Sequence, residues 1–188
     1  MFKNRFPLLI ACVALSLSLF SCGGDPKESK EYKDLKAQLD KIQVEDSLEN
    51  ANIELYKKLS AINDTTELEQ LDALIAPDVN FHDMPEGMPA GLEGFRQLLK
   101  GYFTSIPNMQ ADIKHILAKG DIVIAHIGLK GVNSGPSGPM PATGKSIDVD
   151  GYECARIADG KVVEFWSLAN EMKMLTQLGL MPEMGGGE

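Results

Sequence analysis

The hydrophobic pattern changes its period near Pro107, and this change limits the chain to a fold that joins helices to a sheet. Upstream, apolar residues recur every three or four positions, as on one face of an α-helix. Downstream, they alternate with polar residues, as on a half-buried β-strand. The helical pattern occurs in three segments. The first covers residues 48–62, the second starts at a Thr66–Glu69 capping box and stops at Pro77, and the third covers 91–103. The alternating pattern covers 109–118, 122–131, 147–158 and 161–168, with a short strand at 79–82 and a last helix at 171–178.

Each pair of long strands is separated by a turn dipeptide, Gly120-Asp121 in the first pair and Asp159-Gly160 in the second. Such dipeptides favour tight hairpins. Residues 133–144, between the hairpins, are rich in Pro and Gly and are predicted to form a loop or lid. Helices followed by antiparallel hairpins predict an α+β layer fold.

The N-terminus is typical of an exported precursor. Lys3 and Arg5 precede an uncharged apolar run at 8–20, which is shorter than the roughly 20 residues that span a bilayer. Leu19-Phe20-Ser21-Cys22 resembles the lipobox of bacterial lipoproteins, and this resemblance implies cleavage before Cys22 and lipid on its thiol. An ordinary secretory signal with an incidental cysteine is the alternative.

These features divide the chain into four segments. Residues 1–21 are a lipoprotein signal peptide, 22–47 the lipidated cysteine and a polar tether, 48–182 the globular domain, and 183–188 a flexible tail. Within the tether, apolar residues at helical spacing (Tyr32, Leu35, Leu39 and Ile42) predict either a solvated spacer helix or a short coiled coil.

The charge of the chain restricts its partners. The formal net charge is −9, and removal of Lys3 and Arg5 with the signal makes it more negative. An acidic body does not attract nucleic acid or anionic lipid, so the anchor is expected to be its only contact with a membrane. Once Cys12 is removed and Cys22 is lipidated, Cys154 remains, and a single thiol forms no internal disulfide. The sequence has no CxxC, no HExxH and no glycine-rich phosphate loop, and no metal site is predicted.

Several short runs resemble the SnoaL-like polyketide cyclase, or ester cyclase, family of the NTF2-like superfamily. They are Gly91-Leu92-Glu93-Gly94-Phe95, Gly120-Asp121-Ile122-Val123, Gly144-Lys145, Asp159-Gly160-Lys161-Val162-Val163-Glu164-Phe165-Trp166 and Gln177-Leu178-Gly179-Leu180. The resemblance implies a cone in which a curved antiparallel sheet wraps around three helices and leaves an apolar pocket. It further implies aldol-type ring closure of a polyketide ester without a cofactor, by a base near an acidic C–H and donors near an enolate oxygen.

An Asp159-Gly160 turn with regular pairing places Glu153 opposite Trp166 and on the same face as Glu164, with Cys154 and Phe165 on the other face. If the strand continues, Asn170 joins the first face. The family carries its catalytic Asp four residues after this Trp, where this chain has Asn170. It often has a His where this chain has Asn133. An amide can orient a substrate but cannot serve as a carboxylate base.

The remaining candidates lie around the expected pocket mouth. His82 and Asp83 end the short strand and are candidate acid/base groups, with a solvated strand end as the alternative reading for His82. Glu153 is a candidate base. The expected pocket wall comprises Phe81, Met84, Asn133, Glu164 and Trp166. His115 and His126 face each other in the first hairpin, either as a ligand pair or as an exposed pair at the outer face or a dimer interface.

Two functions follow from the resemblance and the anchor. The first is a cofactor-independent cyclase for a small apolar carbonyl or polyketide-like compound, held in the bacterial cell envelope, at the outer membrane if the host is diderm. The second is a non-catalytic module of the same fold that binds a small apolar ligand or forms a homodimer through its outer sheet face.

Overall fold

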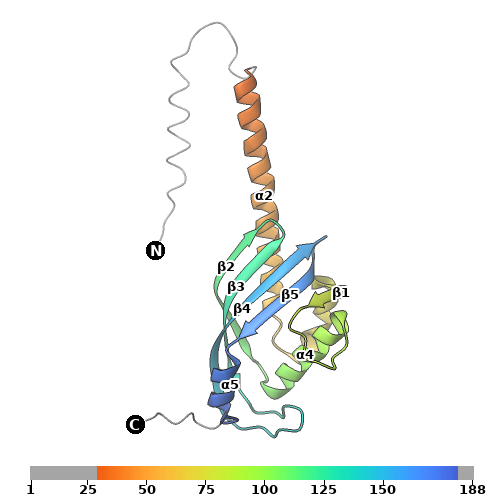
Figure 1. Ribbon diagram of the computed structural model, residues 1–188, viewed down its shortest axis with the longest axis vertical. Coiled ribbons are helices and arrows are strands. Elements are labelled where there is room, and N and C mark those ends of the chain that lie inside the picture. Colours follow the sequence, from red (N-terminus) through yellow and green to blue (C-terminus); the bar gives the residue numbers. More distant parts are fainter. Residues whose placement is uncertain (1–28, 182–188) are drawn as a thin grey trace, which may run out of the picture. The chain divides into compact units, whose positions relative to one another are not determined.

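The computed structural model of the chain describes residues 29–181 (Figure 1). Cys22, the signal peptide at 1–21 and the tail at 183–188 lie outside the described residues. The chain divides into two units between Gln43 and Val44. Within residues 29–181, no helix is both long enough and apolar enough to cross a membrane.

Helix α2 runs without a break over Lys30–Ser60, so one helix replaces the tether helix and first domain helix that the sequence predicted separately. In the first unit, the apolar side chains of α2 at the predicted helical spacing are exposed. In the second unit, Asn52, Tyr56 and Leu59 of the same helix are buried. Glu49 accepts hydrogen bonds from Lys119 Nζ and Gly120 N, and Asn52 Nδ2 donates to Gly120 O, which ties α2 to a β-turn.

The next helical segment is shorter than predicted. A 3₁₀ helix, η3, spans Thr65–Gln70, and a single turn, α3, spans Leu71–Leu74. Asp64, rather than Thr66, caps η3 by accepting a hydrogen bond from Thr66 N. Strand β1 then begins at Ile75, earlier than predicted, and runs to Phe81. Helix α4, Gly91–Ser105, matches its prediction.

Four long strands follow, as the alternating pattern predicted. They are β2 (Gln110–Lys119), β3 (Ile122–Val132), β4 (Ser146–Ala158) and β5 (Lys161–Ala169), and helix α5 (Glu171–Leu178) closes the domain. The strand order is β1-β5-β4-β3-β2. Pairs within β2–β5 are antiparallel, but β1 pairs with β5 in parallel, so the sheet is mixed and the prediction of a fully antiparallel sheet was wrong.

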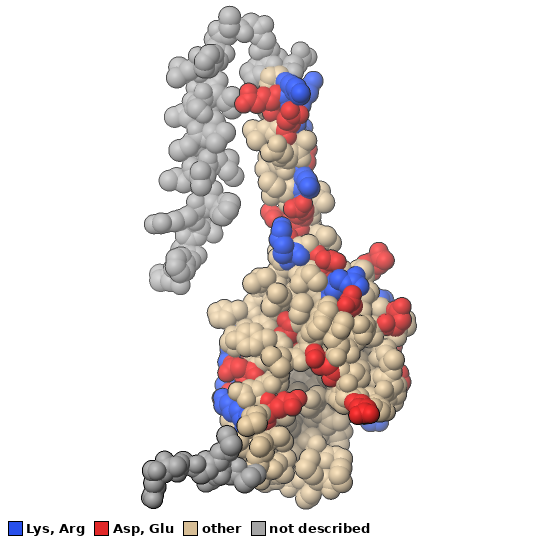
Figure 2. Space-filling model, in the orientation of Figure 1, with Lys and Arg blue, Asp and Glu red and all other residues tan. Residues whose placement is uncertain are grey.

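The core lies between the inner face of this curved sheet and the helices (Figure 1). Tyr56 of α2 and Phe95 of α4 pack with Val123, Ala155 and Phe165 of the sheet. On the face in view in Figure 2, acidic and basic side chains are interspersed, with no continuous basic area.

Candidate functional site

Glu153 of β4 is the acidic side chain that points into the helix-covered side of the sheet. Its Oε2 lies 2.5 Å from the hydroxyl of Tyr56, which donates the hydrogen bond from α2. Tyr56 is fully buried, whereas Glu153 is half-buried. In the register of the sheet, Glu153 lies opposite Ser167 of β5 and Ala125 of β3.

Burial determines the electrostatics of this pair. Desolvation raises the pKa of the Glu153 carboxyl from 4.5 to about 7, although the hydrogen bond from Tyr56 favours the charged form. Burial, followed by the charge of Glu153, raises the pKa of the Tyr56 hydroxyl, which therefore stays protonated as a donor. A carboxyl that titrates near neutral pH is suited to take up and release protons.

The second hairpin departs from the predicted register. Asp159 and Gly160 both adopt positive φ, and Ala158 pairs with Lys161, as a tight turn requires. A bulge then shifts the pairing between Ile157 and Arg156, so Cys154 pairs with Trp166. Because one inserted residue exchanges the two faces of a strand, the expected face of Glu153, Glu164 and Trp166 is wrong.

Instead, Glu164 and Trp166 lie with His82 on the outer face of the sheet. The His82 ring stacks on Trp166 with centroids 4.2 Å apart, and its Nε2 lies 2.9 Å from Glu164 Oε2. Arg156 donates to Glu164 from the neighbouring strand. His82 and Arg156 lower the pKa of the Glu164 carboxyl by hydrogen bonding. The sequence-predicted group is thus split, with Glu153 alone on the inner face.

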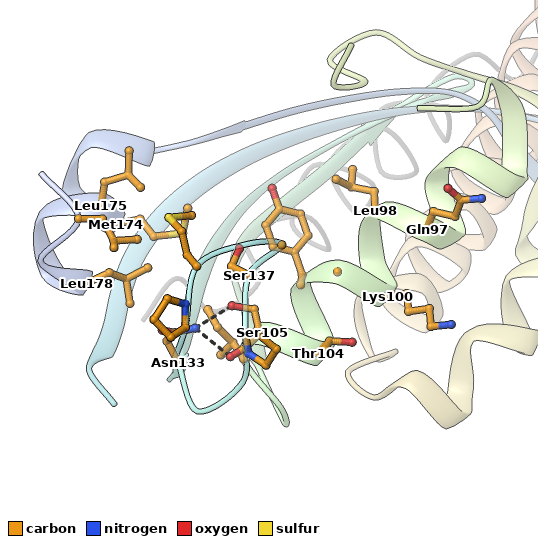
Figure 3. A pocket seen from close by; sticks show the side chains of 18 residues that line it. Gln97, Leu98, Lys100, Thr104, Ser105, Asn133, Ser137, Met174, Leu175 and Leu178 are labelled. Atoms are coloured by element: carbon orange, nitrogen blue, oxygen red, sulfur yellow. Dashed lines mark hydrogen bonds between the residues drawn. The ribbon is translucent and has the colours of Figure 1, made fainter. Parts of the chain in front are cut away.

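A cavity of about 570 Å³ lies between α4, the 133–144 loop and α5 (Figure 3). Met174, Leu175 and Leu178 of α5 form one wall, opposite Leu98 of α4. The other lining residues are Gln97, Lys100, Gly101, Tyr102, Thr104, Ser105, Ile106, Asn133, Pro136, Ser137, Gly138, Met140, Pro141 and Leu180. No Asp, Glu, His or Cys is among these described lining residues. The cavity therefore suits an apolar ligand and offers few groups for proton transfer.

Asn133 organises the floor of this cavity. Its buried Nδ2 donates to Ser105 Oγ, Ser105 O and Gly135 O, and its Oδ1 accepts from both N and Oγ1 of Thr143. Figure 3 shows the bonds to Ser105. Because both ends of the amide are engaged, Asn133 holds the loop against the end of α4 rather than presenting a free polar group to a ligand.

A smaller recess of about 130 Å³ adjoins the cavity and shares Leu98 and Tyr102 with it. Its remaining walls come from β1, the loop after β1, α4, and the junction of β5 with α5: Phe81, Asp83, Pro85, Phe95, Phe165, Ser167, Ala169 and Glu171. The Asp83 carboxylate accepts a hydrogen bond from Ser167 N. Since Ser167 is directly opposite Glu153, the recess reaches the part of the sheet that carries the perturbed carboxyl.

The other predicted site residues have identifiable positions. Asn170 caps α5 by accepting from Lys173 N. Met84 packs against the core and lines a separate hollow of about 290 Å³ beside the loop after β1. His115 and His126 pair across the first hairpin, as predicted, and His126 also stacks on Tyr152. Among residues 29–181, no three His, Cys, Asp or Glu side chains are placed to hold a metal.

Sequence reasoning missed Tyr56, Tyr102, Ser167 and Glu171. Tyr56 occurs on the apolar face of a helix, where the sequence pattern predicts a core residue rather than a site residue. Its buried hydroxyl requires a partner, and that requirement is the one signal that could have linked it to a polar group on the sheet.

Comparisons with known proteins identify the family and support the fold. The family described as SnoaL-like polyketide cyclase matches residues 53–178. A proposed polyketide cyclase of Bacillus cereus shares 25% identity over 70% of this chain and 83% of its own, with a TM-score of 0.61. IdmH of Streptomyces antibioticus, also a proposed polyketide cyclase, shares 28% identity over 68% of this chain and 98% of its own, with a TM-score of 0.60.

TsrD of Streptomyces laurentii shares 20% identity over 70% of this chain and 97% of its own, with a TM-score of 0.64, and it supports the fold alone. No curated protein matches the chain. Because the family model matches residues 53–178, well over half of the chain, and the solved structures share the fold, the chain belongs to the SnoaL-like polyketide cyclase family.

Proposed function

We propose that this chain is a lipid-anchored protein of the bacterial cell envelope whose domain binds a small, largely apolar carbonyl compound and closes a ring in it without a cofactor. Glu153 carries the proposal, because its carboxyl lies on the inner face of the sheet with a pKa raised to about 7. The cavity between α4 and α5 provides the apolar binding volume.

The proposed reaction starts with the Glu153 carboxylate. It removes a proton from the carbon beside a carbonyl, and the resulting enolate attacks a second carbonyl of the same molecule. One carbon–carbon bond forms, and the proton returns from Glu153 to the new alkoxide. The Tyr56 hydroxyl holds the carboxyl in place. Ser167 lines the recess and lies directly opposite Glu153, and the Cβ atoms of opposed residues in a regular antiparallel pair are about 4.5–5.5 Å apart. We infer that a substrate held at the recess can approach the Glu153 carboxyl.

The anchor is supported by the N-terminal sequence. Lys3, Arg5, the apolar run and the lipobox-like segment before Cys22 occur in the order that lipoprotein processing requires. Several acyl chains on one residue hold a protein firmly to a bilayer, whereas one chain binds weakly. The proposed chemistry would then take place outside the cytoplasm.

A second candidate is a binding module without chemistry. It is favoured by the large cavity, whose described lining includes no carboxyl or imidazole group. Asn170 also stands where the resemblance implies a catalytic Asp, and its side chain caps α5. In this case, the compound is held and released unchanged, and the raised pKa of Glu153 reflects burial alone.

Native mass spectrometry of the protein purified from its host membranes identifies the retained compound. That compound is then incubated with the wild-type protein and with the Glu153→Gln and Glu164→Gln variants. If Glu153 is the base, Glu153→Gln slows ring closure by about 100-fold or more, while Glu164→Gln, which removes an outer-face carboxylate, leaves the rate unchanged. Equal turnover by both variants refutes the role of Glu153. A compound that all three proteins return unchanged establishes the binding module.

A further inference from the structure

The N-terminal part of α2 has an apolar stripe that no described residue covers. The helix continues without a break through residues 30–43, which belong to the first unit (Figure 1). Every residue from 29 to 44 is exposed. The stripe consists of four side chains that are 40–53% exposed: Tyr32, Leu35, Leu39 and Ile42. Because most helices in proteins are stabilised by packing of an apolar face, this stripe calls for a partner.

The stripe has the spacing of a coiled-coil seam. Its members recur at intervals of three, four and three residues, which are the a and d positions of a heptad with Tyr32 at a. The side chains between them are polar except Ala37, so the stripe is narrow. A helix that packs on a globular core has a broader apolar face, whereas a narrow a/d stripe fits a second helix.

The seam ends at the start of the second unit. The next a and d positions carry Asp46 and Glu49. Glu49 already accepts hydrogen bonds from Lys119 Nζ and Gly120 N. Two copies of Asp46 facing each other would repel. The seam is therefore confined to residues 32–42, and a helix pair of this length is marginal unless something else favours the association.

The side chains beside the seam favour a second copy of the same helix in parallel. In a parallel pair, a residue at position g lies beside the residue at the next position e of the other helix. Here these positions bring Glu31 beside Lys36 of the second copy, and Gln38 beside Gln43. The first pair is of opposite charge, and the second can exchange amide hydrogen bonds. By symmetry, each pair occurs on both sides of the seam.

The segment also lacks the acidic excess of the whole chain. Residues 30–43 contain four lysines and three carboxylates, whereas the chain has 18 Lys+Arg and 27 Asp+Glu. Repulsion between two acidic domains therefore does not extend to the helices. The proposed anchor at Cys22 precedes the helix in every copy, so it would align two helices in parallel. It would also confine them to one surface and raise their effective concentration.

We propose that α2 associates with α2 of a second copy of this chain as a short parallel coiled coil, with Tyr32, Leu35, Leu39 and Ile42 in the seam. The inference rests on the anchor of the proposed function for the alignment and local concentration of the helices. It does not depend on Glu153 or on the cavity.

Disulfide trapping of the full chain in host membranes tests this arrangement. The chain carries Cys154→Ser and one new cysteine, either at seam position d (Leu35→Cys) or at outward position b (Asp40→Cys), and the chain without a new cysteine gives the background. A disulfide requires Cα atoms within about 7 Å. After mild oxidation, Leu35→Cys should therefore give at least about fivefold more product of twice the chain mass than Asp40→Cys.

Charge reversal tests the parallel register. In the Leu35→Cys chain, Lys36→Glu should lower the cross-linked fraction by about threefold or more, because it places a second carboxylate beside Glu31. The Glu31→Lys/Lys36→Glu exchange should restore the fraction. Lys33→Glu makes the same change of charge at an outward position and should leave the fraction unchanged.

Equal yields from Leu35→Cys and Asp40→Cys, or a product that joins the chain to a different protein, overturn the proposal. Failure of the charge exchange to restore cross-linking overturns the parallel register. Incorporation of labelled fatty acid at Cys22 is measured in the same membranes and reports on the anchor separately. Labelling without cross-linking refutes the coiled coil alone, and cross-linking without labelling refutes the anchor alone.

Discussion

Replacement of Glu153 by Gln should change how the stability of the domain depends on pH. The Glu153 pKa is about 7 in the folded protein against an ordinary value of 4.5. Each pKa unit corresponds to about 1.4 kcal/mol, so ionisation of this carboxyl destabilises the folded state by about 3 kcal/mol. Below the ordinary pKa, the group is protonated in both states and there is no penalty. As pH rises from the ordinary pKa through the folded pKa, the domain loses this much free energy of unfolding.

The assay is urea unfolding of the wild-type and Glu153→Gln proteins at several pH values between about 4.5 and 8. The free energy of unfolding of the wild type should fall by about 3 kcal/mol relative to the variant across this range, since Gln does not titrate. Gln retains a polar partner for the Tyr56 hydroxyl.

Glu164→Gln is the matched control. His82 and Arg156 lower the pKa of Glu164, so its stabilising effect is present above the ordinary value of 4.5 and is lost as pH falls through the lower folded pKa. The two variants should therefore diverge from the wild type in opposite directions. Parallel curves for the wild type and Glu153→Gln would refute the claim that Glu153 is desolvated on the inner face.

Three further predictions concern the cavity floor, α5 and the anchor. Asn133→Ala should destabilise the domain by about 2–4 kcal/mol in urea unfolding, because Ser105 at the end of α4 and Thr143 in the 133–144 loop lose their hydrogen bonds to the amide. A change below about 1 kcal/mol would contradict the organising role of Asn133. Asn170→Ala should lower the free energy of unfolding by about 1 kcal/mol, whereas Asn170→Asp should preserve it, since either Asn or Asp caps a helix. Equal stability of the wild type and Asn170→Ala in urea unfolding would contradict the capping role. Cys22→Ser should prevent incorporation of labelled fatty acid in the host, while Cys154→Ser should not; labelling of the Cys22→Ser protein would refute the anchor.

Local sequence signals predicted the elements that depend on near neighbours. Three such predictions were confirmed, because each element is specified within a few residues: the apolar face of α4, the turn at Gly120-Asp121 and the helix that ends at Gly179. The pairing of His115 with His126 also followed from the first turn, since the register between the turn and this pair is regular.

The site was less predictable because it depends on longer-range packing. The bulge in the second hairpin inserts a single residue, and this exchanged the faces of Glu164 and Trp166 relative to Glu153. No periodicity reveals a bulge of this kind. The contact of Tyr56 with Glu153 joins residues 97 positions apart and depends on how α2 crosses the sheet. The parallel pairing of β1 with β5 is likewise set by packing rather than by a turn.

We propose that the domain holds a small apolar carbonyl compound between α4 and α5, and NMR titration of the isotope-labelled protein with acetophenone can detect such binding. Binding in this cavity should give saturable shifts of the Tyr102, Ser137 and Leu175 amide signals, while the outer-face signal of Tyr152 stays unchanged. These shifts should be abolished when Leu178→Trp fills the cavity. Shifts confined to Tyr152 and its outer-face neighbours, or signals around the cavity that do not move up to the solubility limit, would show that the compound does not bind there.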